Sequence, residues 1–274
     1  MILVADVLAA VRRAYPESLA EEWDSGIGLT CGDPLEPVEG VLLAVDADDT
    51  TVDEAIARGA GILLTHHPLL FRPVQSVAAD TPKGALLHRM IRAGVAHIAA
   101  HTNADSAVGG VNDALAQALG LAVEGPLAPS APGAVTGIGR IGHLPSPLRL
   151  QEFAALVAEA LPATVAGVRA AGDPRRSISR VAVCGGAGDS LLVEAAASGA
   201  DVYLTSDLRH HVVAEYVANP LNPAVVEVAH WSGEWPWLDR AAGMLTSRFP
   251  GLTTTISSTR TDPWTIHANS TPTS

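Results

Sequence analysis

The 274-residue chain contains one lysine, two cysteines and no long uncharged apolar run, and each shortage excludes a class of protein. Lys83 lies outside any G-x-x-x-x-G-K-[ST] pattern, which excludes a P-loop nucleotide site. Cys31 and Cys184 are too few for a disulfide framework or a cysteine-rich zinc site, so we expect a reduced, cytoplasmic setting. Residues 2–11 are apolar, but Asp6 interrupts them and arginines follow, the reverse of a signal peptide. No run approaches the roughly 20 apolar residues of a transmembrane helix, so we expect no membrane partner.

Positive charge is also scarce. Lysine and arginine number 17 against 29 aspartate and glutamate residues, which gives a formal net charge of −12. This balance repels polyphosphate at long range, so we expect no nucleic-acid partner. Hydrophobic residues make up 48% of the chain and charged residues 17%, which indicates a compact protein with a substantial core. The length suits two modest α/β lobes or one large domain.

Two segments that lie 140 residues apart share one pattern of turns and apolar runs. In each, a buried strand is followed by a helix with a polar cap and then by a second strand, which is the order of a β-α-β unit. The first copy covers residues 40–65 and the second covers residues 181–205. The alanine-rich composition accounts for some identities between them, but the turn glycines Gly59 and Gly199 and the strand ends also coincide. We therefore predict an α/β fold of two related lobes.

Histidine, by contrast, is plentiful, with ten residues. Open α/β sheets bind ligands at the carboxyl ends of their strands, and three predicted strand ends carry histidine or carboxylate side chains. The adjacent histidines point to opposite sides of an extended backbone, so they cannot easily chelate one ion, but they can serve two ions or take one each of two roles. The other two ends each place an imidazole and a carboxylate four residues apart, which one helical turn brings together. The three groups are His66 with His67, His101 with Asp105, and His230 with Glu234.

These side chains supply nitrogen and oxygen ligands without sulfur, a set that suits zinc, manganese, iron, cobalt or nickel. Five or six such ligands are too many for one tetrahedral structural zinc and about right for two ions bridged by a carboxylate. Each motif alone is also common in hydrogen-bonded loops that bind no metal. The joint occurrence of the motifs at strand ends is what favours a metal site. We therefore predict a dinuclear site with two divalent ions per chain. Its metal ligands are His66, His67, Asp105, His230 and Glu234, with His101 in reserve.

Two further features have competing interpretations. Residues 184–190 form a glycine-rich turn whose N–H groups could cradle a phosphate, but the third glycine of a G-x-G-x-x-G fingerprint is missing. A tight turn capped by Asp189 or Ser190 is the favoured interpretation. His210 and His211 begin a helical segment, and they either line the same cleft as the metal ligands or face solvent.

Several short motifs, spread over almost the whole chain, also match a known family. They include WDSGIGL (23–29), THHPLLF (65–71), HTNAD (101–105), GGVND (109–113), VCGGAG (183–188), TSDLRHH (205–211) and HWSGE (230–234). With these motifs the sequence resembles the NIF-three-like dinuclear metal-centre proteins, often labelled GTP cyclohydrolase I type 2 homologues. At 274 residues it resembles the short form without the inserted extra domain. It departs from the family's pattern at Ser25, where Asn is usual, and at Gly233, where a hydroxyl residue commonly precedes the glutamate.

The resemblance implies the same five metal ligands that the spacing indicates, with Glu234 in the position that bridges both ions and His101 near them. It also implies a two-lobed α/β fold with the metals between the lobes, and a ring-like homohexamer with an interior cavity. The departure at Gly233 removes no ligand, but it would alter the hydrogen bonds that orient the glutamate.

The position of these ligands also predicts how the lobes are divided. Because they come from the first half and from near the C-terminus, the chain has to return to its first lobe to complete the site. We expect a first lobe at residues 1–125 that is rejoined by residues 230–267. A Pro/Gly/Ser linker at 126–133 leads into a second lobe at residues 134–229, and the small polar residues 268–274 form a flexible tail.

Two functions from different classes fit such a site. The first is a metal-dependent hydrolase of a nucleotide, pterin-like or phosphoester substrate, in which a water shared by two ions is deprotonated near neutral pH and attacks. In a purine ring-opening version the attack falls on C8 of GTP, with Glu234 between the ions and His101 or His211 carrying the proton. The alternative is a non-catalytic metal-binding, metal-delivery or regulatory protein. Turnover by the metal-loaded protein discriminates the two.

Overall fold

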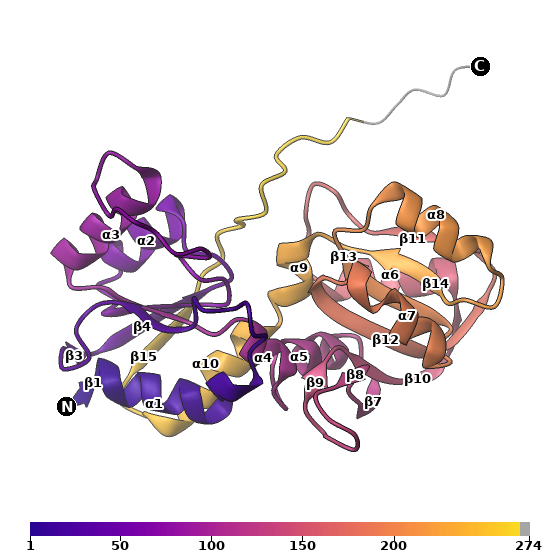
Figure 1. Cartoon of the computed structure of the whole chain (residues 1–274), viewed down its shortest axis with the longest axis horizontal. Coiled ribbons are helices and arrows are strands. Elements are labelled where there is room, and N and C mark those ends of the chain that lie inside the picture. Colours follow the sequence, from indigo (N-terminus) through magenta and orange to yellow (C-terminus); the bar gives the residue numbers. More distant parts are fainter. Residues whose placement is uncertain (269–274) are drawn as a thin grey trace.

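Residues 1–268 are described by a computed structural model, in which two large β-sheets are each covered by helices on both faces (Figure 1). The helices are α1 (Val4–Ala14), α2 (Asp49–Ala57), α3 (Pro82–Ala93), α4 (Thr102–Ser106), α5 (Val111–Ala118), α6 (Leu150–Ala160), α7 (Leu192–Ala197), α8 (His210–Ala218), α9 (His230–Glu234) and α10 (Trp237–Arg248), with short 3-10 helices η1 (Glu17–Leu19) and η2 (Asp189–Leu191). The strands are β1 (Ile2–Leu3), β2 (Gly28–Cys31), β3 (Pro37–Val38), β4 (Gly40–Ala44), β5 (Ile62–Thr65), β6 (Ala96–Ala99), β7 (Ala122–Gly125), β8 (Ala128–Pro129), β9 (Gly137–Ile138), β10 (Arg140–Arg149), β11 (Arg169–Ala171), β12 (Ser177–Ala187), β13 (Val202–Ser206), β14 (Ala224–Glu227) and β15 (Thr253–Ile256).

The first sheet has the strand order β15-β4-β5-β6-β2, in which β15, β4, β5 and β6 are parallel and β2 is an antiparallel edge. β4, β5 and β6 are buried at every position, because parallel sheets carry helices on both faces. Helices α1 and α10 pack on one face, and α2 and α3 pack on the other (Figure 1). Since β15 follows α10, the C-terminal part of the chain completes this lobe.

The second sheet has the order β11-β14-β13-β12-β10-β7, with β12, β13 and β14 parallel at its centre. Helices α5 and α6 contribute to the core on one face, and α7 and α8 pack on the other. At the 140-residue offset, β4, α2 and β5 correspond to β12, α7 and β13. The fold class is therefore confirmed as mixed α/β with two lobes, each of which contains a corresponding β-α-β unit.

Strand β7 lies in the second sheet, although we expected the first lobe to extend to residue 125. It pairs antiparallel with β10, and the preceding helix α5 bridges the two cores. Val111 and Ala114 of α5 pack in the first core, whereas Leu115 and Ala116 pack in the second. The chain therefore crosses between the lobes through α5. The expected linker instead contributes β8, which forms a short hairpin with β9.

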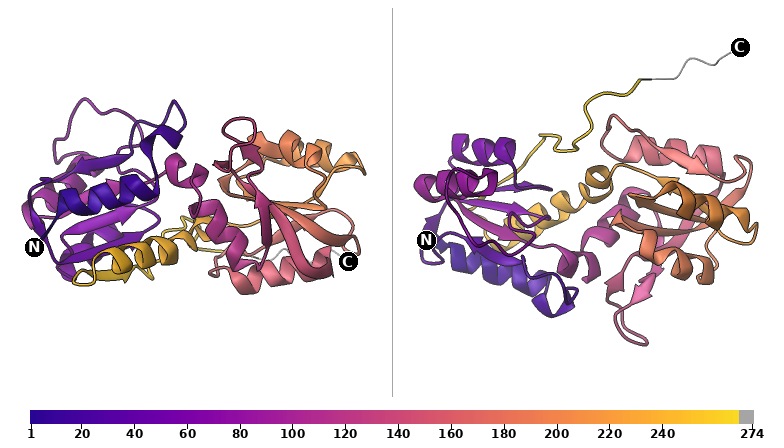
Figure 2. Two further views of the ribbon diagram at one scale, coloured as in Figure 1. Left: turned by 90° about the horizontal axis from the view of Figure 1, so that it is seen from below. Right: turned by 45° about the horizontal axis from the view of Figure 1, so that its top comes forward.

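The two lobes are also joined near the C-terminus. Figure 2 shows α10, in gold, beneath the first sheet, with α9 leading into it from the second lobe. The chain after β15 runs upward between the lobes in Figure 1, and Ser257 Oγ donates to Glu54 Oε2 at 2.6 Å near its start. Of the predicted tail, residues 269–274 lie outside the described part of the chain. Within residues 1–268, no helix is both long and apolar enough to cross a membrane.

Candidate metal centre

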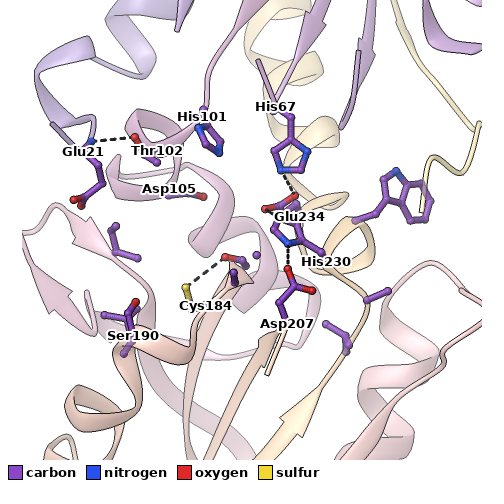
Figure 3. Close-up of a pocket in the computed structure, with 18 of the residues that line it drawn as sticks. Glu21, His67, His101, Thr102, Asp105, Cys184, Ser190, Asp207, His230 and Glu234 are labelled. Atoms are coloured by element: carbon purple, nitrogen blue, oxygen red, sulfur yellow. Dashed lines mark hydrogen bonds and ion pairs between the residues drawn. The ribbon is translucent and has the colours of Figure 1, made fainter. Parts of the chain in front are cut away.

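The carboxyl ends of strands from both sheets meet at one cleft between the lobes (Figure 3). The adjacent histidines directly follow β5, and the His-x-x-x-Asp motif follows β6 with its carboxylate on α4. Helix α9 follows β14 and places its histidine and glutamate one turn apart. The structure thus brings together all six side chains that the strand-end motifs single out, namely His66, His67, His101, Asp105, His230 and Glu234.

The carboxylate of Glu234 lies at the centre of this group and is only 2% exposed. Its Oε1 lies 2.9 Å from His230 Nε2 and 3.3 Å from His66 Nε2. Its Oε2 lies 3.1 Å from His67 Nε2. Asp105 Oδ1 lies 3.8 Å from His66 Nε2. One buried carboxylate therefore faces three imidazoles and can contact more than one ion.

Each imidazole in the group is oriented by a hydrogen bond at its Nδ1 atom. The acceptors are Ala100 O for His66 at 2.9 Å, Asp46 Oδ1 for His67 at 2.7 Å, Asp24 Oδ2 for His101 at 2.9 Å, and Asp207 Oδ2 for His230 at 2.6 Å. Donation from Nδ1 leaves Nε2 as the nitrogen that a metal ion would take in place of a proton, which is the arrangement that metal-ligating histidines adopt. The four rings are therefore positioned to present Nε2 as a ligand atom.

Several ligand-type atoms at the centre are buried without a hydrogen-bond partner. They are His66 Nε2, Asp105 Oδ1 and Glu234 Oε2. Leaving one such atom unpaired costs about 1–3 kcal/mol, and here three converge. Ligand atoms of two residue sets lie within 4.8 Å of one another, one set being His66, His67 and His101 and the other His67, His230 and Glu234. A divalent cation would satisfy these atoms, so the side chains present fit the predicted kind of site.

The electrostatics of the centre agree with this fit. Burial alone would raise the pKa of Glu234, but the charges of His230, His67 and His66 hold it well below its ordinary value. The charge of Glu234 in turn outweighs burial and raises the pKa of His230 to about 11. Burial opposes protonation of His67, yet Glu234 and Asp46 raise its pKa to about 10. The buried carboxylate therefore requires nearby positive charge.

The glycine-rich segment at the end of β12, where the sequence predicted a turn, allows the second lobe to approach the candidate ligands. Gly186 has a φ of +74°, and a Cβ at this position would lie 2.6 Å from Glu234 Oε1 and 3.2 Å from His230 Nε2. The N–H of Gly185 donates to Asn112 Oδ1 at 2.8 Å, and that of Gly188 donates to Ser206 O at 3.4 Å. Two amides of the segment are therefore already bonded, and its backbone packs against the His/carboxylate group.

Two predicted candidates lie elsewhere. His210 and His211 begin α8, where both are exposed, and neither lines the cleft. Their rings contact each other, with centroids 5.1 Å apart. Because α8 packs on the face of the second sheet, His211 is not positioned to carry a proton at the centre within this chain.

The sequence interpretation missed the aspartates that orient the rings. Although burial alone would raise the pKa of Asp24, hydrogen bonds from His101 and Thr102 lower it to about 2, so it stays ionised. Asp46 follows β4, and Asp207 follows β13 with a φ of +58°, which is uncommon outside glycine. An acidic residue just after a parallel strand is the signal that could have found both.

The cleft has a volume of about 1550 Å³ and is lined by residues of both lobes. Its floor is the His/carboxylate centre, and its walls include the 128–130 segment, the 184–187 turn and residues 261–264. Fold and side chains together define a two-lobed α/β protein whose central cleft contains a group that could hold divalent ions.

The chain belongs to the Duf34/NIF3 (NGG1p interacting factor 3) family, whose sequence profile matches residues 2–263. This confirms the family that the motifs indicated. A protein of Streptomyces coelicolor named GTP cyclohydrolase 1 type 2 homolog is 47% identical over 99% of this chain and 96% of its own length. A protein of the same name from Mycobacterium tuberculosis is 37% identical, covering 97% of each chain, in an alignment of 373 positions. Since this chain has 274 residues, the mycobacterial protein contains segments that this chain lacks.

Solved structures of related proteins have the same fold. A Bacillus cereus protein related to NIF3 has a TM-score of 0.89 and 26% identity, covering 97% of this chain and 99% of its own. A hypothetical protein of Staphylococcus aureus has a TM-score of 0.87 and 26% identity at the same coverage. The two-lobed arrangement is thus shared with both of these solved structures.

Proposed function

We propose that this chain binds two divalent metal ions at the centre around Glu234 and uses them to hydrolyse a nucleotide, pterin-like or phosphoester substrate. The main support is the set of unpaired, buried ligand atoms around one carboxylate, with every neighbouring Nδ1 already bonded elsewhere. The name GTP cyclohydrolase 1 type 2 homolog, carried by the relatives, belongs to the same reaction class.

The side chains divide into ligands and groups that support them. His66, His67, Asp105, His230 and Glu234 would hold the ions, which when bound supply an activated water and stabilise developing negative charge. Asp46 and Asp207 hold the rings of His67 and His230 in the ligating tautomer. His101, tied to Asp24 through Nδ1, presents its other nitrogen to the cleft and would either complete the ligand set or carry the proton.

Metal binding is tested by elemental analysis. We expect close to two ions per chain, and we expect the double variant His66→Ala, His67→Ala to lose them. The matched control is His210→Ala, His211→Ala, which also removes two adjacent histidines but on the exposed start of α8. Equal metal content in the two double variants would contradict the proposed site.

Hydrolysis is tested with the metal-loaded chain against nucleotides, pterins and phosphoesters. We expect turnover that Glu234→Gln abolishes while the variant keeps its fold by circular dichroism. If no substrate is turned over above the Glu234→Gln background with any of the five candidate metals, the non-catalytic metal-binding, delivery or regulatory function replaces the hydrolase.

The predicted homohexamer, the cytoplasmic location and the absence of a nucleic-acid partner also belong to this proposal. Light scattering coupled to gel filtration gives the oligomeric state, and a mass other than six chains would contradict the hexamer. The low content of basic residues supports the expectation about nucleic acid.

A further inference from the structure

Two large aromatic side chains are exposed at the edge of the metal cleft. Trp23 is 59% exposed and Phe71 is 53% exposed, and both line the cleft. Their ring centroids lie 5.8 Å apart, and each lies within 6 Å of the His101 ring, at 5.9 Å for Trp23 and 5.7 Å for Phe71. An aromatic pair left exposed beside a reactive centre is typical of a binding surface, because burial would otherwise stabilise such rings.

The backbone beneath both rings is fixed. Trp23 precedes Asp24, whose buried carboxylate accepts hydrogen bonds from Thr102 Oγ1 at 2.6 Å and from the Thr102 N–H at 3.1 Å. Phe71 follows the buried Leu69 in the loop after the two histidines. The segment that follows Trp23 and the segment that precedes Phe71 are in close contact. Gly26 and Pro68 approach so closely that a Cβ at Gly26 would lie 2.8 Å from Pro68 Cβ. The aromatic pair is therefore held at a set position relative to the metal ligands.

The charge of the cleft wall restricts what can bind on this surface. Among the described residues that line the cleft, Arg169 is the only arginine or lysine, and its Nε already donates to Glu227 Oε2 at 2.8 Å. Six lining carboxylates lie outside the metal ligands, namely Glu21, Glu22, Asp46, Asp207, Glu227 and Asp262. Carboxylates accept hydrogen bonds from ring N–H and amino groups but repel phosphate, which proteins bind with arginine, lysine, metal ions or free helix N-termini. Apart from Arg169 and the two proposed ions, the described wall therefore supplies no cationic group of this kind.

We propose that the substrate is recognised by a planar heteroaromatic ring that stacks on the Trp23–Phe71 pair, and that it carries no polyphosphate chain. This rests on the proposed function, because it assigns the substrate class of the same cleft. It separates the ring of a nucleotide, which this cleft fits, from its triphosphate, for which the described wall residues supply no unpaired arginine or lysine.

Calorimetry on the full, metal-loaded chain tests the proposal with guanosine, pterin, GTP and inorganic tripolyphosphate as probes. We expect guanosine or pterin to bind, and GTP to bind no more tightly than guanosine. Trp23→Leu and Phe71→Leu should each weaken ring binding on the order of ten-fold, the effect of losing one stacking contact. Trp264→Leu is the matched control. Trp264 is 66% exposed on the same cleft, but within residues 1–268 its ring does not contact those of Trp23 and Phe71.

Four results would overturn the proposal. They are tripolyphosphate or GTP binding ten-fold more tightly than guanosine, no binding of either ring compound, unchanged ring affinity in both variants of the pair, and an equal loss in Trp264→Leu. Thermal unfolding of each variant verifies that it is folded. Ring binding without any turnover above the Glu234→Gln background refutes the hydrolase alone, whereas turnover that is insensitive to Trp23→Leu and Phe71→Leu refutes the stacking surface alone.

Discussion

Substitution of Gly186 by alanine tests whether the second lobe's turn sets the geometry of the metal centre. Its φ of +74° lies in the left-handed region, so alanine there costs about 1–2 kcal/mol of folding free energy from backbone strain alone. The new methyl group would also lie 2.6 Å from Glu234 Oε1. To reach ordinary van der Waals contact, which begins at about 3.5 Å, the carboxylate must retreat by roughly 0.8 Å or more.

This displacement falls on a side chain that has little room to move. Glu234 is 2% exposed and lies among His66, His67 and His230. Binding sites need their ligands within about 0.5 Å of the productive geometry, so the shift is large enough to disturb them. By comparison with substitutions that disturb the support of a ligand, we expect metal affinity to fall about 10- to 100-fold.

Gly59→Ala provides the matched control for backbone strain. Gly59 has a φ of +64°, and a Cβ there would meet no atom within 4 Å. In the metal-free state Gly59→Ala should lose about 1–2 kcal/mol by urea titration and Gly186→Ala at least as much, because the latter adds the contact with Glu234 to the same strain. Only Gly186→Ala should lose metal affinity by competition with a chromogenic chelator. Equal affinity in the two variants would refute the role assigned to the turn.

Three other perturbations have defined outcomes. Asp207→Ala should weaken metal binding about 10- to 100-fold by calorimetry because it removes the acceptor that orients His230, while Asp189→Ala, in an exposed ion pair, should leave the affinity unchanged. Burial lowers the pKa of His97 from 6.5 to about 3, so the unfolded chain binds the proton first and stability should fall by about 1 kcal/mol per pH unit from pH 6.5 toward pH 3. His97→Gln should flatten that part of the urea-denaturation profile, and an unchanged slope would contradict the assignment. Arg140→Ala should cost about 3–5 kcal/mol in the same assay, because the buried guanidinium pairs with Asp113 and donates to the carbonyls of Gly137 and Ala107, and a loss below 1 kcal/mol would be inconsistent with that network.

The cluster of histidine and carboxylate side chains was readable from the sequence because each of its parts is local. A histidine pair directly after a strand and a histidine four residues before a carboxylate are fixed by the geometry of one strand end or one helical turn. Helix α9 shows this, since its His230 Nε2 lies 2.9 Å from Glu234 Oε1 as the spacing requires. The duplicated β-α-β unit was also visible, because its turn glycines and strand ends recur at a fixed offset.

The parts that the sequence did not reveal depend on contacts between distant residues. Asp24 lies 77 positions from His101, and Asp46 lies 21 positions from His67, so no local period connects them. The spacing of apolar residues in α5 predicts which of them are buried. It does not predict that they pack in two different cores. Strand β7 is short and mostly exposed, so its place in the second sheet follows only from pairing with β10.

The sequence by itself indicated which residue types form the candidate site and which family the chain belongs to, because both depend on residue types and short spacings. The tertiary structure decided which of the candidate histidines belong to the site, since the packing of α8 directs His211 to solvent while α9 carries Glu234 between the lobes. It also decided the surroundings of the site, an acidic cleft with Trp23 and Phe71 at its edge. The burial of a side chain and the electrostatic potential around it depend on residues from the whole chain, so only the folded structure determines them.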